Sequence, residues 1–171
     1  ILWINLVTDG LPALALGVEP SEPRVMHQKP RNSQESVFAG GMSYRIILYG
    51  CLIGTLGLLA YYFGIQQTGS VGKARSMAFA TLAFSQLFQA LNARSTESLF
   101  RVGLFSNKYM VLALLGSAGL QLMVMLVPAL QLVFGVVSLE PQHWSLVIRL
   151  SAVPVLVGEI QKLVVKMRQA Q

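Results

Sequence analysis

Residues 1–17 read I-L-W-I-N-L-V-T-D-G-L-P-A-L-A-L-G, an apolar segment with one carboxylate, Asp9, the only aspartate in the chain. Asp9 stands about ten residues before the following loop, which is roughly 15 Å at helical rise. That distance reaches the midplane of a hydrocarbon core about 30 Å thick. Because a carboxylate at that depth is costly, its presence in a membrane-spanning helix indicates a function.

The residues around Asp9 predict a broken helix that carries an ion site. Asn5, Thr8 and Asp9 are spaced i, i+3 and i+4, so they share one face of an α-helix. Pro12 cannot donate a hydrogen bond to the carbonyl of Thr8, and Gly10 lets the backbone bend nearby. A break there would offer carbonyl and side-chain oxygens at mid-membrane, the ligands that hard cations such as Ca²⁺ prefer. The alternative is a kinked helix in which Asp9 pairs with a neighbouring helix.

The composition of the whole chain is that of a membrane protein. Of its 171 residues, 54% are hydrophobic and 12% are charged, and the mean hydropathy is +0.59, whereas soluble domains carry about 25% charged residues. In lipid, a helix satisfies its own backbone polar groups. We therefore expect an all-α membrane fold, a bundle of about five transmembrane helices with the first broken at the ion site. The five segments run from 1 to 18, 44 to 65, 77 to 91, 109 to 133 and 144 to 165.

The basic residues predict the orientation of the bundle. Most of the thirteen Lys and Arg residues fall in the first long loop, in the loop before the fourth segment, and in the C-terminal tail. Cytoplasmic loops carry an excess of Lys and Arg, so we expect these regions, including the C-terminus, in the cytoplasm. The net charge of +6 is then loop charge, and no nucleic-acid partner is expected. The residues concerned are Arg24, Lys29, Arg31, Arg45, Arg94, Arg101, Lys108, Lys162, Lys166 and Arg168.

Amide and carboxylate side chains in the later segments have simpler interpretations. Gln86 and Gln89 share one face of the third segment, where neutral amides either bind ions or hold helices together. Gln86 is a weak candidate for the metal site, and Gln89 is expected to contact a neighbouring helix. Glu159 stands one turn before Lys162 near the cytoplasmic end of its segment, so we interpret it as a structural residue that either extends to the membrane surface or pairs with Lys162.

Residues 5–20, N-L-V-T-D-G-L-P-A-L-A-L-G-V-E-P, resemble the sixth transmembrane helix of P-type calcium pumps. The stretch P-R-N-S-Q-E-S at 30–36 is similar to the loop that follows. F-S-Q-L-F-Q-A-L-N at 84–92 is similar to the eighth helix, and P-V-L-V-G-E-I at 154–160 to the tenth. The resemblance covers the whole chain. It implies that residues 1–171 are the C-terminal transmembrane domain of such a pump, its sixth to tenth helices.

In that family, residues at the positions of Asn5, Thr8 and Asp9 coordinate the transported cation. Sodium/potassium pumps typically have aspartate where this chain has Asn5, which favours calcium. At the position of Gln86, two-site calcium pumps have glutamate and one-site pumps have glutamine. The resemblance therefore implies export of Ca²⁺ from the cytoplasm with one ion site and proton countertransport. Calcium and manganese remain alternatives as the transported ion.

The resemblance also implies partners outside this sequence. The phosphorylated aspartate of the family lies in D-K-T-G-T, a motif absent here, so we expect no ATP hydrolysis by this chain alone. ATP and Mg²⁺ would bind catalytic domains in the N-terminal remainder of the same protein, which also supplies five helices. The lipid bilayer is the other partner, and the short outer loops suggest a bacterial plasma membrane. The alternative class is a non-enzymatic channel or membrane scaffold with several spans.

Overall fold

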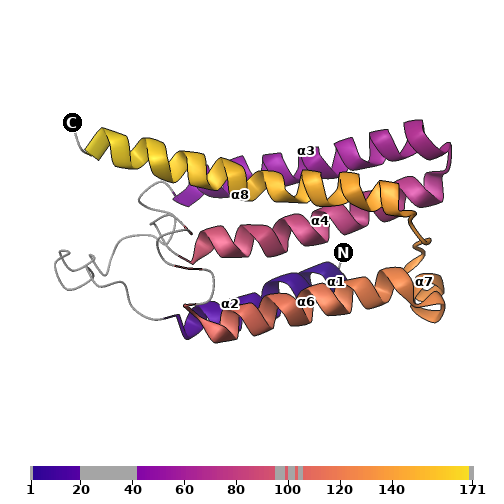
Figure 1. Ribbon diagram of the computed structural model, residues 1–171, viewed down its shortest axis with the longest axis horizontal. Coiled ribbons are helices and arrows are strands. Elements are labelled where there is room, and N and C mark those ends of the chain that lie inside the picture. The colour runs from indigo at the N-terminus through magenta and orange to yellow at the C-terminus, as the bar shows by residue number, and fades with distance from the viewer. Residues whose placement is uncertain (1, 20–41, 95–98, 100–102, 104–105, 170–171) are drawn as a thin grey trace.

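The computed structural model describes residues 2–19, 42–94, 99, 103 and 106–169. Within these ranges the chain is helical and contains no strand, which confirms the all-α prediction for them. Figure 1 shows α1 to α2, α3, α4, α6 and α8 running along a common axis. The helices in order are α1 (Leu2–Ile4), the π-helix η1 (Asn5–Gly10), α2 (Leu11–Gly17), α3 (Met42–Thr68), α4 (Val71–Ala93), α6 (Lys108–Leu126), α7 (Pro128–Phe134) and α8 (Pro141–Gln169).

Parts of two predicted cytoplasmic loops lie outside the described residues. The P-R-N-S-Q-E-S stretch at 30–36 is among them, and so are the basic residues Arg24, Lys29, Arg31 and Arg101. The interpretation of these segments therefore rests on the sequence.

The N-terminal segment is one helix whose hydrogen-bonding pattern widens around Asp9. The backbone at Ile4, Gly10 and Leu11 keeps right-handed helical dihedral angles, so the chain does not unwind there. Pro12 stands at the start of α2 without an N–H to donate, and the six residues of η1 precede α2. The prediction of a broken helix is therefore wrong in one respect: the backbone around Asp9 does not unwind, and residues 5–10 form a π-helix instead.

A tight turn joins α3 to α4 and brings the two helices into close contact. Gly69 has φ +60°, a left-handed conformation that glycine adopts without strain, and the Ser70 hydroxyl accepts a hydrogen bond from the N–H of Lys73. A Cβ on Gly64 would lie 2.7 Å from the Cα of Ala74, so a larger residue would force the helices apart. Because this turn leads directly into helix, α4 begins at Val71 rather than at the predicted residue 77.

The fourth predicted segment is two helices and not one. Val127 adopts extended backbone angles between α6 and α7, and Pro128 begins α7, as expected for the residue before a proline. The amide of Gln131 donates a hydrogen bond of 2.7 Å to the carbonyl of Met125, which helps to satisfy the backbone at the break. The prediction of a continuous helix from 109 to 133 is therefore wrong at Val127.

α4 is the central helix of the bundle, since it packs against α3, α6, α8 and η1. Its fully buried Met77 joins Val124 of α6 and Val147 of α8 in the core. α8 runs from Pro141 to Gln169 and so extends beyond the predicted range of 144 to 165 at both ends. This packing holds α4 in a fixed position against η1, where the predicted ion ligands lie.

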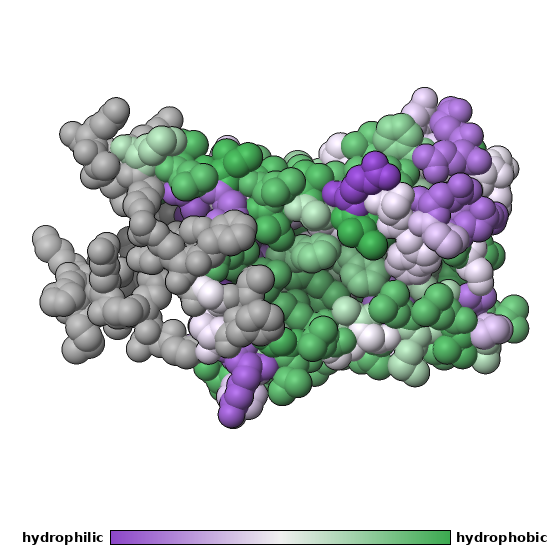
Figure 2. Space-filling view, in the orientation of Figure 1, coloured by the Kyte–Doolittle hydropathy of each residue, from purple (hydrophilic) through white to green (hydrophobic). Residues whose placement is uncertain are grey.

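The two most apolar helices are long enough to cross a membrane. α3 and α6 meet that criterion by length and composition among the described residues. Only 17% and 28% of their apolar windows are buried inside the protein, although apolar side chains of soluble proteins are mostly buried. Figure 2 shows hydrophobic residues over much of the visible flank of the bundle. These features support a membrane protein, and the count of five spans stays a prediction.

Candidate functional site

The hydroxyl group of Thr8 lies at the centre of a cluster of oxygen atoms. Its Oγ1 is 2.7 Å from the carbonyl oxygen of Ile4, 2.6 Å from Oε1 of Gln86 and 3.4 Å from Oδ1 of Asp9. One hydroxyl carries one proton, so it can donate fully to only one of these three acceptors. Rotation of the Gln86 amide would instead present its NH₂ group to Thr8. The cluster thus gathers several oxygen atoms around Thr8, the type of ligand that hard cations prefer.

A cavity of about 260 Å³ adjoins this cluster, between the N-terminal helix, α3 and α4. Thr8 is buried, Gln86 is half-buried and Asp9 is exposed toward this open side of the bundle. Much of the remaining wall is apolar, which suits a ligand that is held by a few polar groups. The cavity is lined in part by Thr8, Asp9, Pro12, Ile53, Gln86 and Gln89.

The structure brings together three of the four predicted ligands. Thr8, Asp9 and Gln86 line the cavity, whereas Asn5 is exposed and does not line it. A π-helix takes more residues per turn than an α-helix, so Asn5 and Thr8, which are three residues apart, no longer share one face. Asn5 is exposed like Asp9 but lies one turn before it. Among the described residues, no three His, Cys, Asp or Glu side chains form a group that could hold a metal.

Gln89, predicted to be a helix contact, lines the same cavity. Its Oε1 also accepts a hydrogen bond of 3.1 Å from the amide of Asn92, and Asn92 in turn donates to the carbonyl of Pro154 at 2.8 Å. Gln89 therefore takes part in a chain of polar contacts that leads from the cavity to α8. The pairing predicted for Glu159 is present, with 3.3 Å between its Oε1 and Nζ of Lys162.

A residue that the sequence analysis did not select supports the π-helix. The Ser117 hydroxyl on α6 donates a hydrogen bond of 2.6 Å to the carbonyl of Val7. In a π-helical pattern, that carbonyl would pair with the N–H of residue 12, which is proline and has none. Ser117 thus satisfies a backbone group that Pro12 cannot. A lone serine in an apolar segment is the only sequence signal for this role.

Three helix ends meet where α2 and α4 finish and α6 begins. The carboxylate of Glu19 accepts hydrogen bonds from Nη2 of Arg94 at 2.8 Å and from the amide of Asn107 at 2.6 Å. Asn107 also donates to the carbonyl of Ala15 and caps the start of α6. The side chain of Arg94 is 1% exposed and that of Glu19 is 16% exposed. This Glu19–Arg94 pair joins the two helices that carry Asp9 and Gln86.

The surroundings of Glu19 favour its ionised form. Burial raises the pKa of the Glu19 carboxyl, but the hydrogen bonds from Arg94 and Asn107 and the positive charge of Arg94 together outweigh it. The pKa of Glu19 therefore lies below its ordinary value. The sequence analysis assigned Arg94 only to a cytoplasmic loop and did not identify its buried partner.

Comparison with known proteins finds a family and several relatives that the sequence matches. Residues 1–164 match the family described as "Cation transporting ATPase, C-terminus". The "Calcium-transporting ATPase 1" of Bacillus cereus is 42% identical over 183 residues, covering 97% of this chain and 20% of the relative. The "Calcium-transporting ATPase" of Bacillus subtilis is 42% identical over 155 residues, covering 90% of this chain and 17% of the relative.

A eukaryotic relative shows similar coverage. The "Calcium-transporting ATPase type 2C member 1" of Homo sapiens is 34% identical over 170 residues, which cover 99% of this chain and 18% of the relative. The chain thus spans about a fifth of the length of these relatives.

Proposed function

Because the chain belongs to the cation-transporting ATPase family and matches its C-terminal region, we propose that residues 1–171 form the C-terminal transmembrane domain of an ATP-driven pump that exports Ca²⁺ from the cytoplasm. The names of the relatives support calcium as the transported ion. The observation in this chain that carries the proposal is the oxygen cluster around Thr8, beside the only aspartate in the sequence.

The transported cation binds in the cavity between the N-terminal helix and α4. Asp9 supplies the negative charge, Thr8 supplies its hydroxyl oxygen, and Gln86 supplies an amide oxygen. These are the hard oxygen ligands that Ca²⁺ prefers, but the ion takes six to eight of them. Asn5 can contribute only if a change in the helix turns it toward the ion. With neutral Gln86 in place of a second acid, we expect a single site.

The remaining ligands and the energy source lie in other parts of the protein. Asp9 and Asn5 are exposed on the open side of the bundle, where helices from the N-terminal remainder can add oxygen ligands. The domains that bind ATP and Mg²⁺ and accept the phosphate belong to that remainder too. This chain alone therefore supplies part of the ion site and hydrolyses no ATP.

Release of the cation leaves Asp9 without its counter-charge. A proton taken up from the side to which the ion is released would restore the balance of charge in the site. Return of that proton to the cytoplasm amounts to proton countertransport. Reconstituted vesicles that take up calcium should then lose internal protons, and an unchanged internal pH during uptake would contradict this step.

Equilibrium binding of radioactive calcium to the purified full-length protein tests the single site. We expect about one bound ion per molecule, because this chain offers one carboxylate and neutral amides at the cavity. A Gln89→Leu variant is the matched control, since Gln89 lines the same cavity and also contacts Asn92, and its stoichiometry should be unchanged. Two bound ions per molecule would show that the site has been misread.

The orientation follows from the basic loops. We place the C-terminus in the cytoplasm and the protein in a bacterial plasma membrane, since Lys162, Lys166 and Arg168 gather in the C-terminal tail. An alkaline phosphatase fused after Gln171 is active only outside the cytoplasm and should stay inactive. The same reporter inserted at Gly69, in the turn between α3 and α4, is the positive control. Activity at Gln171 would overturn this topology.

A further inference from the structure

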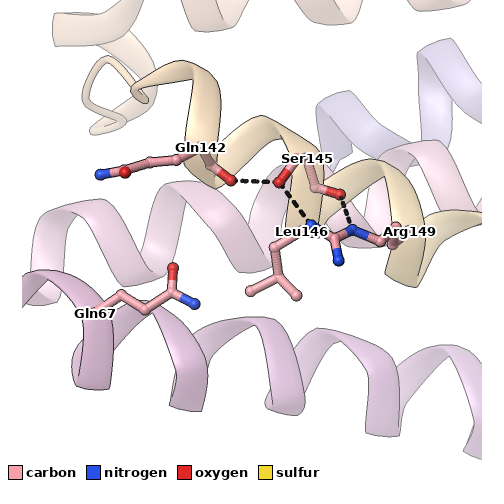
Figure 3. A pocket seen from close by; sticks show the side chains of 5 residues that line it. All are labelled: Gln67, Gln142, Ser145, Leu146 and Arg149. Atoms are coloured by element: carbon pink, nitrogen blue, oxygen red, sulfur yellow. Dashed lines mark hydrogen bonds between the residues drawn. The ribbon is translucent and has the colours of Figure 1, made fainter.

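A second cavity, of about 500 Å³, lies at the opposite end of the bundle from the Glu19–Arg94 pair, where α3 ends and α8 begins. In Figure 3, Gln67 of α3 and Leu146 of α8 point toward each other, and the guanidinium group of Arg149 lies beside them. Figure 2 shows hydrophilic residues gathered at this end of the flank. The cavity is lined by Gln67, Gln142, Ser145, Leu146 and Arg149.

Arg149 is held so that its charge faces the cavity near the start of α8. It lies eight residues after Pro141, about 12 Å along the helix, and its side chain turns back toward the helix start. Nε donates to the carbonyl of Ser145 at 3.1 Å and Nη2 donates to the Ser145 hydroxyl at 3.0 Å. A guanidinium group has five N–H donors, so most of them remain available to a ligand.

The charge of Arg149 is not neutralised by a nearby acid. Two other charged residues at this end, Lys73 and Glu140, form an ion pair of 2.6 Å with each other, and Arg75 does not line the cavity. Within the part of the chain that the structure describes, Arg149 forms no ion pair. The amide of Gln142 donates to Oε2 of Glu140 at 2.9 Å. The cavity thus presents one unpaired positive charge together with the amide of Gln67, which can also donate hydrogen bonds. This donor set suits a phosphate group.

The walls beyond the cavity suit a hydrocarbon chain. Leu156 lies seven residues after Arg149 on the same face of α8 and is exposed. Phe63 and Leu59 lie one and two turns before Gln67 on α3 and are exposed too. A molecule with a phosphate at Arg149 and an acyl chain along these side chains would match both surfaces. Because the side chain of Arg149 extends toward the start of α8, its guanidinium group can reach the membrane–water interface, where lipid head groups lie.

We propose that this cavity binds a glycerophospholipid, with its phosphate on Arg149 and the amide of Gln67, and an acyl chain along Leu156 and Phe63. The proposal is independent of the ion site at the other end of α4, and it requires only that the bundle lies in a membrane. It assigns a role in lipid binding to Arg149, which does not line the cavity beside Thr8.

The test compares binding of dioleoyl phosphatidylglycerol to the full-length protein and its variants by native mass spectrometry. Arg149→Gln should weaken binding about tenfold, because it removes a charge-assisted bidentate donor. Arg149→Lys keeps the charge, so its affinity for the lipid should lie between those of the original protein and Arg149→Gln. Arg75→Gln is the matched control: Arg75 is also exposed near this end but does not line the cavity, so its affinity should be unchanged.

Two further arms separate the possible outcomes. Dioleoylglycerol, which has no phosphate, should bind the original protein and Arg149→Gln equally. Inorganic phosphate at the same concentration should not displace the phospholipid, because it lacks the acyl chain. The proposal is overturned if Arg149→Gln binds phosphatidylglycerol as tightly as the original protein, if Arg75→Gln weakens binding equally, or if inorganic phosphate displaces the lipid.

Discussion

The Asp9→Asn variant of the full-length protein is expected to form no calcium-dependent phosphoenzyme from ATP. The substitution keeps the shape of the side chain and removes its negative charge. Calcium affinity follows the charge of the ligands, and we expect it to fall on the order of a hundredfold or more. Among the cavity residues Thr8, Gln86 and Gln89 are neutral, so none of them can replace the lost charge. Phosphorylation with labelled ATP over a calcium titration measures the effect.

The matched variant is Gln86→Ala, which removes an oxygen dipole from the same cluster but no charge. It should raise the calcium concentration needed for phosphorylation by a much smaller factor than Asp9→Asn. Phosphorylation by inorganic phosphate in the absence of calcium should survive in both variants, which shows that they are folded. Full calcium transport by Asp9→Asn would show that Asp9 is not an ion ligand.

The second large effect is expected for Arg94→Ala, which breaks the buried Glu19–Arg94 pair. Removing one partner of a buried ion pair leaves the other charge uncompensated and typically costs 3–5 kcal/mol. Because the side chain of Glu19 is 16% exposed, water can partly solvate it, and we expect a cost of about 3 kcal/mol. The free energy of unfolding in detergent, measured by chemical denaturation, reports this loss. Lys108→Ala, which removes a basic residue at the same end of the bundle, is the control.

The same pair predicts how stability depends on pH. The pKa of Glu19 is lower in the folded protein than in the unfolded chain, where it is about 4.3. The stabilisation is therefore fully present above that ordinary value and is lost as the pH falls through the lower folded pKa. Glu19→Gln removes the titrating group, so the variant should lose less stability between pH 5 and pH 3, values that bracket about 4.3. Equal acid sensitivity of the two proteins would contradict the role assigned to Glu19.

The residues of the candidate ion site could be selected from the sequence because polar groups are conspicuous in apolar segments. Asp9 and Gln86 lie 77 residues apart in the numbering, and both line the cavity. Asn5 does not line the cavity, and its role as a ligand stays a prediction; the spacing that selected it assumes an α-helix, whereas the segment is π-helical. Whether the segment forms an α-helix or a π-helix depends on tertiary contacts, such as the hydrogen bond from Ser117 to Val7. The spacing of residues within one segment does not reveal such contacts.

The errors in the helix limits have separate physical causes. The start of α4 was missed because Lys73 and Arg75 lower the local hydropathy, although a helix can continue past the apolar region. The break at Val127 was missed because the segment was identified by its apolar residues. Pro128 breaks the helical backbone but adds no polar side chain, so the apolar run continues past it. The Glu19–Arg94 pair was missed because partners in different loops leave no periodic pattern in the sequence.

The contacts around the cavity beside Thr8 also determine the order in which the protein can be assembled during synthesis. Thr8 and Gln86 are 78 residues apart, and Glu19 and Arg94 are 75 residues apart. A ribosome that has made the N-terminal helix must therefore complete α3 and most of α4 before either contact can form. Until then, the segment with Asp9 has neither of these partners. The cluster around Thr8 therefore forms only after α4 has been made up to Gln86, and a ribosome that stalls before Gln86 releases a chain that lacks it.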